Sequence, residues 1–348
     1  MRLVNQLNDG SFKIKMRGLK IFLMVLVILT GLYFLGPQPA KPIYNNNLPQ
    51  VPSSAIELEK HIAKQEAAHK IKPNNEARIV WANDSLKQKT KYAIVYLHGF
   101  SASQEEGNPV HRQIAKQFGC NLYLARLSQH GIDTSETLLN ITADNLWETA
   151  KEAYAIGKQL GDTVILMGTS TGGTLAIQLA AAYPEIGGLL LYSPNIAIND
   201  PNAWLLNNPW GLQIARMVKK SDYNVVTKNF PEYNQYWNRI YRLEAVVQLE
   251  EFVETSMVPA TFEKVHQPTL VLYYYKDEQH QDPVVKVSAM KEMFNQIKTP
   301  AALKSMVAIP NAESHVLASP IVSKDIVSVK KETALFMTNV LKIKSLQP

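Results

Sequence analysis

The chain has 348 residues, of which 46% are hydrophobic, with a formal net charge of +6 and one cysteine. That length fits one large domain with additions, and one cysteine excludes both an internal disulfide and a thiolate metal site. Five basic residues and one acidic residue lie in the first twenty positions, a local charge of +4, which leaves +2 for the remaining 328 residues. The body of the protein is therefore close to neutral, which argues against nucleic-acid binding.

Residues 1–36 predict a membrane segment. The basic N-terminus precedes an apolar run, Ile21–Leu35, which is short for a spanning helix unless Leu19 and Lys20 extend it. We prefer an uncleaved signal anchor to a cleaved signal peptide, because the residues after the run form a poor cleavage site. A buried core helix is the third interpretation. The basic flank predicts a single pass, with the N-terminus in the cytoplasm and the rest on the outer (periplasmic or extracellular) side.

The next segment, 37–53, contains five prolines and three consecutive asparagines, and it predicts a linker with no core-forming pattern. Ser54, with Glu57 three residues later, is a capping-box signature. It predicts a helix to about Lys70 and opens the globular domain, 54–348. A first strand is predicted over 77–82.

The segment Tyr92–Leu97 has the pattern of a buried strand and ends in His98-Gly99-Phe100. Gly99 allows a tight turn that leaves the N–H of Phe100 free to donate. This loop is therefore a candidate for half of an oxyanion hole. His98 is expected to be hydrogen-bonded beneath the loop, and Cys120 to pack as a small hydrophobe.

The most informative stretch is Gly168-Thr169-Ser170-Thr171-Gly172. It lies between the apolar run 163–167, predicted as a buried parallel strand, and the Ala- and Leu-rich segment 174–183, predicted as a helix. A serine between a strand and a helix, with glycines two residues to either side, is typical of a nucleophile elbow. Ser170 is the candidate nucleophile, and the Thr171 N–H is the second oxyanion donor. The competing interpretation is an ordinary turn.

After a predicted strand at Leu189–Ser193 comes an insertion of about residues 195–263 that is rich in aromatic residues. Because α/β sheets bind ligands beyond the carboxyl ends of their strands, we expect this helical cap to cover that edge. Its aromatic side chains suit an apolar pocket for an acyl chain, or they form the cap's own small core. They are Trp204, Trp210, Tyr223, Phe230, Tyr233, Tyr236, Trp237, Tyr241 and Phe252.

A serine nucleophile needs a base and an orienting acid, and in an elbow the chain order is Ser, then Asp or Glu, then His. Three histidines follow Ser170. His266 precedes the next predicted strand, and His280 lies in the loop where the acid is expected. His315, which follows a further strand-like run and a polar turn, is therefore the predicted base.

The loop 276–285, after the predicted strand Thr269–Tyr275, offers three acids: Asp277, Glu278 and Asp282. Asp277 is closest to the strand end. Asp282 begins an Asp-Pro-Val-Val sequence whose valines can pack the start of a helix and fix the direction of the carboxylate. Asp282 is preferred, with Asp277 as the alternative, and any of the three could be a solvated charge or a helix cap.

Four motifs now stand in order: His98-Gly99-Phe100, Gly168 to Gly172, Asp282 to Val285, and Ser314-His315-Val316. Together they resemble the motif set of the α/β-hydrolase fold superfamily, in its carboxylesterase and monoacylglycerol-lipase-like branch. The resemblance covers roughly residues 79–341. It departs from the usual pattern in a longer acid loop and in a serine where a glycine usually precedes the histidine. It implies an α/β fold with a doubly wound, mostly parallel sheet.

The sequence thus predicts a serine hydrolase that cleaves carboxylic esters through an acyl-enzyme, using Ser170, Asp282 and His315, with Phe100 and Thr171 as oxyanion donors. No cofactor or metal is expected. Monoacylglycerols and lysophospholipids are attractive substrates, because the anchor would hold the pocket near lipid. Thioesters and amides would need the same chemistry. Epoxide and haloalkane hydrolysis are disfavoured, since they need a carboxylate at the nucleophile position.

The alternative from another class is a non-catalytic relative that serves as a membrane-tethered ligand-binding or interaction module. The complete motif set argues against it, because a binding module needs no nucleophile, base and acid together. The sequence makes no prediction about the oligomeric state.

Overall fold

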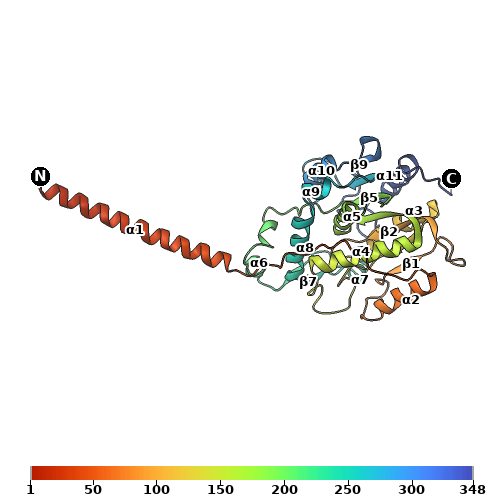
Figure 1. Ribbon diagram of the computed structural model, residues 1–348, viewed down its shortest axis with the longest axis horizontal. Coiled ribbons are helices and arrows are strands. Elements are labelled where there is room, and N and C mark those ends of the chain that lie inside the picture. The colour runs from red at the N-terminus through yellow and green to blue at the C-terminus, as the bar shows by residue number, and fades with distance from the viewer. Residues whose placement is uncertain (1, 347–348) are drawn as a thin grey trace.

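The computed structural model describes residues 2–346, with side chains from residue 16 onward. Seven strands form its central sheet: β1 (Arg78–Val80), β2 (Thr90–Leu97), β3 (Asn121–Leu124), β4 (Gly161–Thr169), β5 (Gly188–Tyr192), β8 (Thr269–Tyr273) and β9 (Lys304–Ala308). Their order across the sheet is β1-β3-β2-β4-β5-β8-β9 (Figure 1). Only β1 pairs antiparallel, with β3, and every other neighbouring pair is parallel. The carboxyl ends of six strands therefore meet at one edge.

Helices cover both faces of this sheet, which confirms the predicted doubly wound α/β fold. Along β2, Ala93 and Val95 pack into one hydrophobic core while Ile94 and Tyr96 pack into the other, as the two-residue period of a strand requires. The first core includes residues of α2 (Ala55–Glu66), α4 (Ala143–Leu160), α5 (Thr171–Ala182) and α10 (Val287–Gln296). The second includes α3 (Val110–Phe118) and α11 (Ile326–Asn339).

Local sequence signals fix several element ends. Ser54 caps α2, and its side chain accepts a hydrogen bond from the N–H of Glu57 at 3.3 Å, as the capping signature predicts. That helix ends at Glu66, earlier than the predicted Lys70. Cys120 is buried and packs into the second core, as expected of a small hydrophobe.

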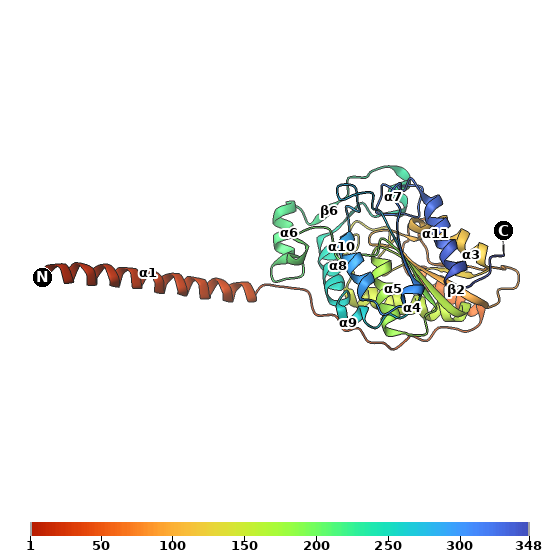
Figure 2. The ribbon, with the colours of Figure 1, turned by 90° about the horizontal axis from the view of Figure 1, so that it is seen from above.

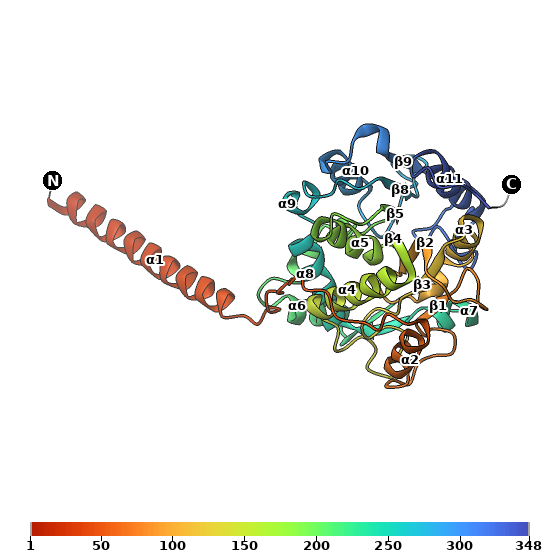
Figure 3. The same ribbon diagram turned by 45° about the vertical axis from the view of Figure 1, so that its right-hand side comes forward.

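The insertion between β5 and β8 is mainly helical. It contains α6 (Gly211–Lys219), α7 (Pro231–Tyr236), α8 (Leu243–Ser256), α9 (Pro259–Phe262) and a two-stranded sheet of β6 (Tyr223–Val225) and β7 (Ile240–Arg242). Figure 3 shows α8 beside α4 and α5, with α6 farther toward the N-terminal helix.

The N-terminal helix α1 (Arg2–Phe34) projects away from the body of the molecule (Figure 1). Within the described residues, Met16–Phe34 is the one segment long and apolar enough to cross a membrane, with a mean hydropathy of 1.8 and no part of it buried. By length and composition this segment fits either a membrane anchor or a signal sequence.

Residues 37–53 form neither helix nor strand, as their composition predicts, yet they are bound along the body of the protein. Lys41 pairs with Glu251 at 3.0 Å, and the Tyr44 hydroxyl lies 2.7 Å from the hydroxyl of Thr255. Tyr44, Leu48 and Val51 pack against the first core. We call residues 37–53 the strap, because its side chains and backbone are held at several points.

Lys151 of α4 holds the asparagine run of the strap. Its ammonium group, although the residue is 1% exposed, donates to Asn45 Oδ1 at 2.8 Å and to the carbonyl of Asn47 at 3.0 Å. The indole of Trp147 donates to the Asn45 carbonyl at 2.8 Å. A buried cation needs such partners, so the asparagines, which look like spacer residues in the sequence, are structural.

Candidate active site

Ser170 occupies a strained turn between β4 and α5. Its backbone lies at φ 52° and ψ −118°, outside the ordinary regions for a residue with a side chain. The flanking glycines are sterically required: a Cβ on Gly172 would overlap the carbonyl of Leu97, and one on Gly168 would overlap the carbonyl of Gly172. The backbone of Ser170 is tied to the sheet, because its N–H donates to the carbonyl of Tyr192 at 2.9 Å.

His315 meets Asp282 on the loop side of the sheet. The two side chains are joined by a 2.7 Å hydrogen bond between Nδ1 and Oδ2. A carboxylate can only accept, so Nδ1 carries the proton, and Nε2 is left as the basic nitrogen. The other oxygen of Asp282 accepts the N–H groups of Val284 and Val285 at 2.9 and 3.1 Å. These bonds fix the direction of a carboxylate that is 1% exposed.

The fold of the acid loop explains why Asp282, rather than Asp277, reaches the histidine. Residues 275–281 close on themselves: the N–H of His280 donates to the carbonyl of Asp277 at 3.2 Å, and Tyr275 bridges to Gln281. The N–H of Asp282 then donates to the carbonyl of Tyr274 at 3.1 Å. Residues 275–281 thus form a small closed loop, and the chain returns to the end of β8 at Asp282.

The two other candidate acids have different partners. Asp277 is half-exposed and pairs with His280 Nδ1 at 2.8 Å. Glu278 accepts a hydrogen bond from the hydroxyl of Tyr275 at 2.7 Å. Of the three acids in the loop, only Asp282 contacts His315.

The pKa shifts of the pair follow from its geometry. Burial acts to raise the pKa of Asp282, but the charge and hydrogen bond of His315 and two backbone N–H groups lower it below its ordinary value. Burial acts to lower the pKa of His315, but Asp282 outweighs it through its charge and hydrogen bond and raises that pKa. The site thus stabilises an imidazolium at position 315.

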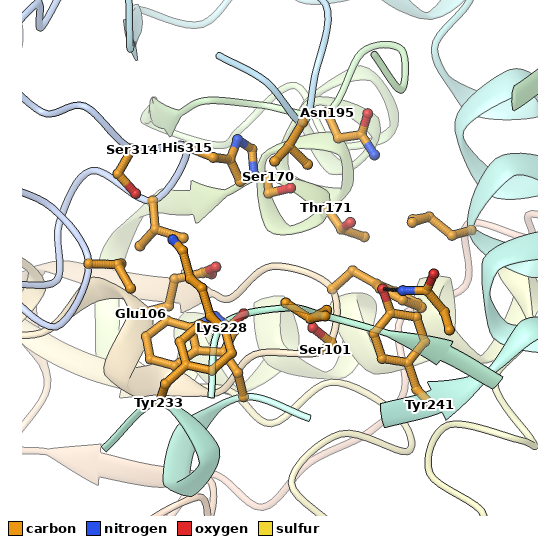
Figure 4. Close-up of a pocket in the computed structure, with 18 of the residues that line it drawn as sticks. Ser101, Glu106, Ser170, Thr171, Asn195, Lys228, Tyr233, Tyr241, Ser314 and His315 are labelled. Carbon is orange, nitrogen blue, oxygen red and sulfur yellow. Dashed lines mark hydrogen bonds between the residues drawn. The ribbon is translucent and has the colours of Figure 1, made fainter. Parts of the chain in front are cut away.

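Ser170 and His315 line the same cavity, and Figure 4 shows their side chains next to each other on its wall. Among the described residues no hydrogen bond joins the Ser170 hydroxyl to His315. Such contacts commonly tighten only when substrate is bound.

Two backbone N–H groups next to Ser170 donate no hydrogen bond within the described residues. They belong to Thr171, the first residue of α5, and to Phe100 in the loop after β2. The loop is held around Phe100, since the N–H of Gly99 donates to Glu106 and that of Ser101 donates to His130 Nε2 at 3.0 Å. Phe100 and Thr171 both line the cavity.

His98 lies beneath this loop, as predicted. It is fully buried, with Nδ1 2.8 Å from the carbonyl of Gly99 and Nε2 accepting the N–H of Leu127 at 3.0 Å. Burial lowers its pKa well below the ordinary value. His98 is therefore a neutral, structural residue.

Glu106 is a site residue that sequence reasoning missed. It lies on a short 3₁₀ turn, Gln104–Gly107, directly after the Phe100 loop, and it faces the cavity although the residue is only 2% exposed (Figure 4). Burial raises the pKa of Glu106 to about 7, and the hydrogen bond from Gly99 opposes this shift. The only sequence signal is its place seven residues after Gly99, and a pair of neighbouring glutamates looks like a solvated turn.

The cavity has a volume of about 420 Å³ and is closed on one side by the cap. Three predicted aromatic residues line it: Tyr233, Trp237 and Tyr241. Tyr233 and Trp237 stack with ring centroids 5.0 Å apart. Trp204 and Trp210, in contrast, are exposed on the surface. Aliphatic side chains join them in the lining, namely Ile198, Val226, Val246, Leu249, Val284, Val316 and Val322. Polar residues around Ser170 and His315 complete it, including Asn195, Asn224 and Lys228.

The chemistry available here is that of an activated hydroxyl. A strained serine, a basic imidazole nitrogen and two residues with free N–H groups line one cavity. A buried carboxylate holds the imidazole from the side away from its basic nitrogen. Within residues 16–346, no group of three or more histidine, cysteine or acidic side chains is arranged to hold a metal ion.

Comparisons of the whole sequence give a partial match. No protein-family profile matches the chain. The thermostable monoacylglycerol lipase of Bacillus sp. (strain H-257) is 31% identical to it over 108 residues. The match spans 31% of this chain and 42% of the lipase, less than half the length of that relative.

Solved structures match over most of the chain. A structure of the metagenome-derived lipolytic enzymes LipS and LipT superposes with a TM-score of 0.60 at 17% identity, covering 77% of this chain and 98% of the other. The monoacylglycerol lipase of Paleococcus ferrophilus gives 0.56 at 13% identity, covering 77% and 100%. Est1E from Butyrivibrio proteoclasticus, with ferulic acid bound, gives 0.51 at 17% identity, covering 77% and 95%. The protein has the α/β-hydrolase fold.

Proposed function

We propose that the protein is a serine hydrolase that cleaves carboxylic esters, with Ser170 as nucleophile, His315 as base and Asp282 as the orienting acid. The observation that supports this most is the His315–Asp282 hydrogen bond of 2.7 Å on the wall of the cavity that holds the strained Ser170. The lipolytic and esterase activities named for the similar proteins point the same way.

In the proposed reaction His315 Nε2 takes the hydroxyl proton of Ser170 as its oxygen attacks the ester carbonyl. The negative charge that develops on the carbonyl oxygen is stabilised by the N–H groups of Phe100 and Thr171. The intermediate collapses, the alcohol leaves with the proton from His315, and an acyl group remains on Ser170. Water, activated by the same imidazole, then releases the acid.

Asp282 supports both half-reactions. It holds the imidazole in the tautomer that presents a basic Nε2, and its charge stabilises the imidazolium that forms in each step. Burial acts to raise the pKa of Asp282, but the charge and hydrogen bond of His315, helped by the two valine N–H groups, lower it and keep the carboxylate ionised.

We propose esters with a single acyl chain, such as monoacylglycerols or lysophospholipids, as the substrate class. A cavity of about 420 Å³ with an aliphatic and aromatic lining suits one chain. The Bacillus and Paleococcus relatives are monoacylglycerol lipases by name.

We further propose that α1 stays uncleaved as a membrane anchor, with the N-terminus in the cytoplasm and the catalytic domain on the outer side. Its apolar part is unburied, as a lipid-facing helix would be, and the positive charge before it favours this orientation.

A fluorophosphonate probe tests the enzymatic proposal against the alternative of a non-catalytic binding module. The full-length protein should be labelled at Ser170 and should hydrolyse p-nitrophenyl esters, with a chain-length optimum that reports the depth of the cavity. Ser170→Ala should lose labelling and lower kcat by about four to six powers of ten, because triad members act as a unit. A folded wild-type protein that is neither labelled nor active would favour the binding module. A loss of only a few-fold in Ser170→Ala, with the variant folded, would overturn Ser170 as the nucleophile.

A further inference from the structure

The cap helix α6 carries an exposed apolar stripe. Ile214, Met217 and Val218 lie at spacings that place their side chains along one face of the helix. Trp210, the N-cap residue, directly precedes the helix. Trp210 is 39% exposed, Met217 71% and Val218 74%. Large apolar side chains gathered at this exposure on a helix indicate a contact surface.

This stripe begins at the end of the apolar helix α1. The indole N–H of Trp210 donates to the carbonyl of Leu32 at 3.0 Å, and its backbone N–H donates to the carbonyl of Pro37 at 3.0 Å. Gly36 lies directly against the indole ring. In Figures 1 and 2, α6 is at the end of the body nearest α1, and its axis runs across that of α1. A bilayer spanned by α1 would thus have α6 along its surface.

The strap fixes how the body of the protein, with α6, is placed relative to α1. Lys41 and Tyr44 are bound to α8, and Asn45 is bound to α4, all soon after the end of α1 at Phe34. A flexible tether would let the body turn any face toward the lipid. A bound strap presents the same face, the one that carries α6.

The charges next to the stripe fit a lipid surface. Lys219 and Lys220, directly after Val218, are exposed and take part in no ion pair within the described residues, whereas Arg216 on the same helix is paired with Asp222 and Glu244. An interfacial helix combines apolar side chains that enter the acyl boundary with cationic side chains at the headgroups. Tryptophan is enriched at that depth.

We propose that α6 is a second membrane contact, lying in the interface of the bilayer spanned by α1, with Trp210, Met217 and Val218 inserted and with Lys219 and Lys220 at anionic phospholipid headgroups. The proposal rests on α1 acting as an anchor. The chain passes from α6 through β6 to Thr227 and Lys228, which line the Ser170 cavity. The contact would therefore hold one wall of that cavity close to the lipid surface.

The test uses the full-length protein in vesicles of phosphatidylcholine and phosphatidylglycerol that contain doxyl-labelled lipids. An environment-sensitive fluorophore is attached at Met217→Cys and, as a control, at Val327→Cys, which is similarly exposed at 75% on α11, away from α1 (Figure 1). The native Cys120 is buried and should stay unlabelled. We expect at least about threefold stronger lipid quenching at 217 than at 327, because an interfacial helix sinks its apolar face into the acyl boundary.

A functional readout accompanies the label. The double variant Met217→Glu, Val218→Glu should slow hydrolysis of vesicle-borne monoacylglycerol at least about fivefold, as charge at the interface opposes insertion. Its hydrolysis of a soluble short-chain p-nitrophenyl ester should be unchanged, since neither residue lines the cavity.

Three outcomes would overturn the proposal, and they can be told apart. Equal quenching at 217 and 327 would mean that α6 is free in water. Shielding of the 217 label from both lipid-borne and aqueous quenchers would mean that another protein chain covers the stripe. If a carbonate wash releases the protein from the vesicles, the proposed anchor and the proposed α6 contact are both wrong. Hydrolysis of the soluble ester by the same protein would still support the proposed hydrolase function.

Discussion

At the scale of single residues, the order of the chemical groups along the chain could be predicted, but the choice of acid could not be made with certainty. Asp277 is nearer to β8 in sequence, and only the closed turn over 275–281 places Asp282 at the strand end instead. Glu106 was missed for a related reason. Its burial depends on a 3₁₀ turn that folds back under Gly99, and no periodic pattern marks such a contact.

The assignment of the acid leads to a prediction with an internal control. Asp282→Asn should lower kcat on the order of a thousand-fold, because the imidazole loses its orienting carboxylate. Asp277→Asn should cost little, since that side chain pairs with His280 in solvent. The two kcat values on one p-nitrophenyl ester settle the matter. A large loss in Asp277→Asn and a small one in Asp282→Asn would reverse the roles.

The pH dependence follows from the same pair. Asp282 raises the pKa of His315, and the base must be neutral to accept a proton, so activity should fall as the pH drops through that raised value. Removing the carboxylate in Asp282→Asn should therefore move the acidic limb of the residual kcat profile to lower pH. An unmoved limb would show that another group controls it.

Glu106 makes a separate prediction about stability. Its pKa in the folded protein, about 7, lies above the ordinary value of 4.5, so its contribution to stability is fully present below pH 4.5 and is lost as the pH rises through 7. Glu106→Gln keeps an acceptor for the N–H of Gly99. Because the glutamine side chain does not ionise, the variant should not lose stability as the pH rises. We expect it to be more stable than the wild type at pH 8 by about 3 kcal/mol, since each unit of pKa corresponds to about 1.4 kcal/mol, with little difference at pH 4.5.

Urea unfolding at the two pH values measures this difference. Glu105→Gln, one residue earlier and half-buried, controls for the loss of a nearby charge. If the difference in stability between Glu106→Gln and the wild type is the same at pH 4.5 and pH 8, the raised pKa of Glu106 is contradicted.

At the scale of elements, strands that are buried on both faces could be predicted well, because their apolar runs need no distant partner to be recognised. The strap could not, because the partners of its asparagines, among them Trp147 and Lys151, come about a hundred residues later in the chain. Polar side chains in a proline-rich segment normally indicate a spacer. Here the Asn45 side chain and the Asn47 carbonyl accept hydrogen bonds from the buried ammonium of Lys151.

Lys151→Met should therefore loosen the strap while the rest of the fold persists. The variant removes the ammonium that donates to Asn45 Oδ1 and to the Asn47 carbonyl, at a cost of about 1–3 kcal/mol. Cleavage after Tyr44 by chymotrypsin should become faster. Lys158→Met, on the same helix α4 but at an exposed pair with Glu185, should leave the cleavage rate near that of the wild type. Equal rates in both variants would mean that Lys151 does not hold the strap.

At the scale of the whole molecule, the fold places the apolar helix α1 and the candidate active site in separable parts of the chain, with the strap between them. Every residue that lines the Ser170 cavity comes from Phe100 onward, while the apolar helix ends at Phe34. Removing residues 1–36 should thus release a soluble protein with unchanged kcat on a soluble ester. Its unfolding should also be unchanged, because the strap remains bound.

Removal of residues 1–53 should behave differently, although it deletes no residue of the proposed site. It uncovers Trp147 and the ammonium of Lys151, and it removes Tyr44, Leu48 and Val51 from the core surface. The free energy of unfolding should fall by several kcal/mol, since buried polar groups lose their partners and apolar area is exposed. Urea unfolding of the two truncated proteins compares them directly. If both unfold at the same denaturant concentration, the strap is a passive tether, and the fixed orientation from which the α6 contact is argued is lost with it.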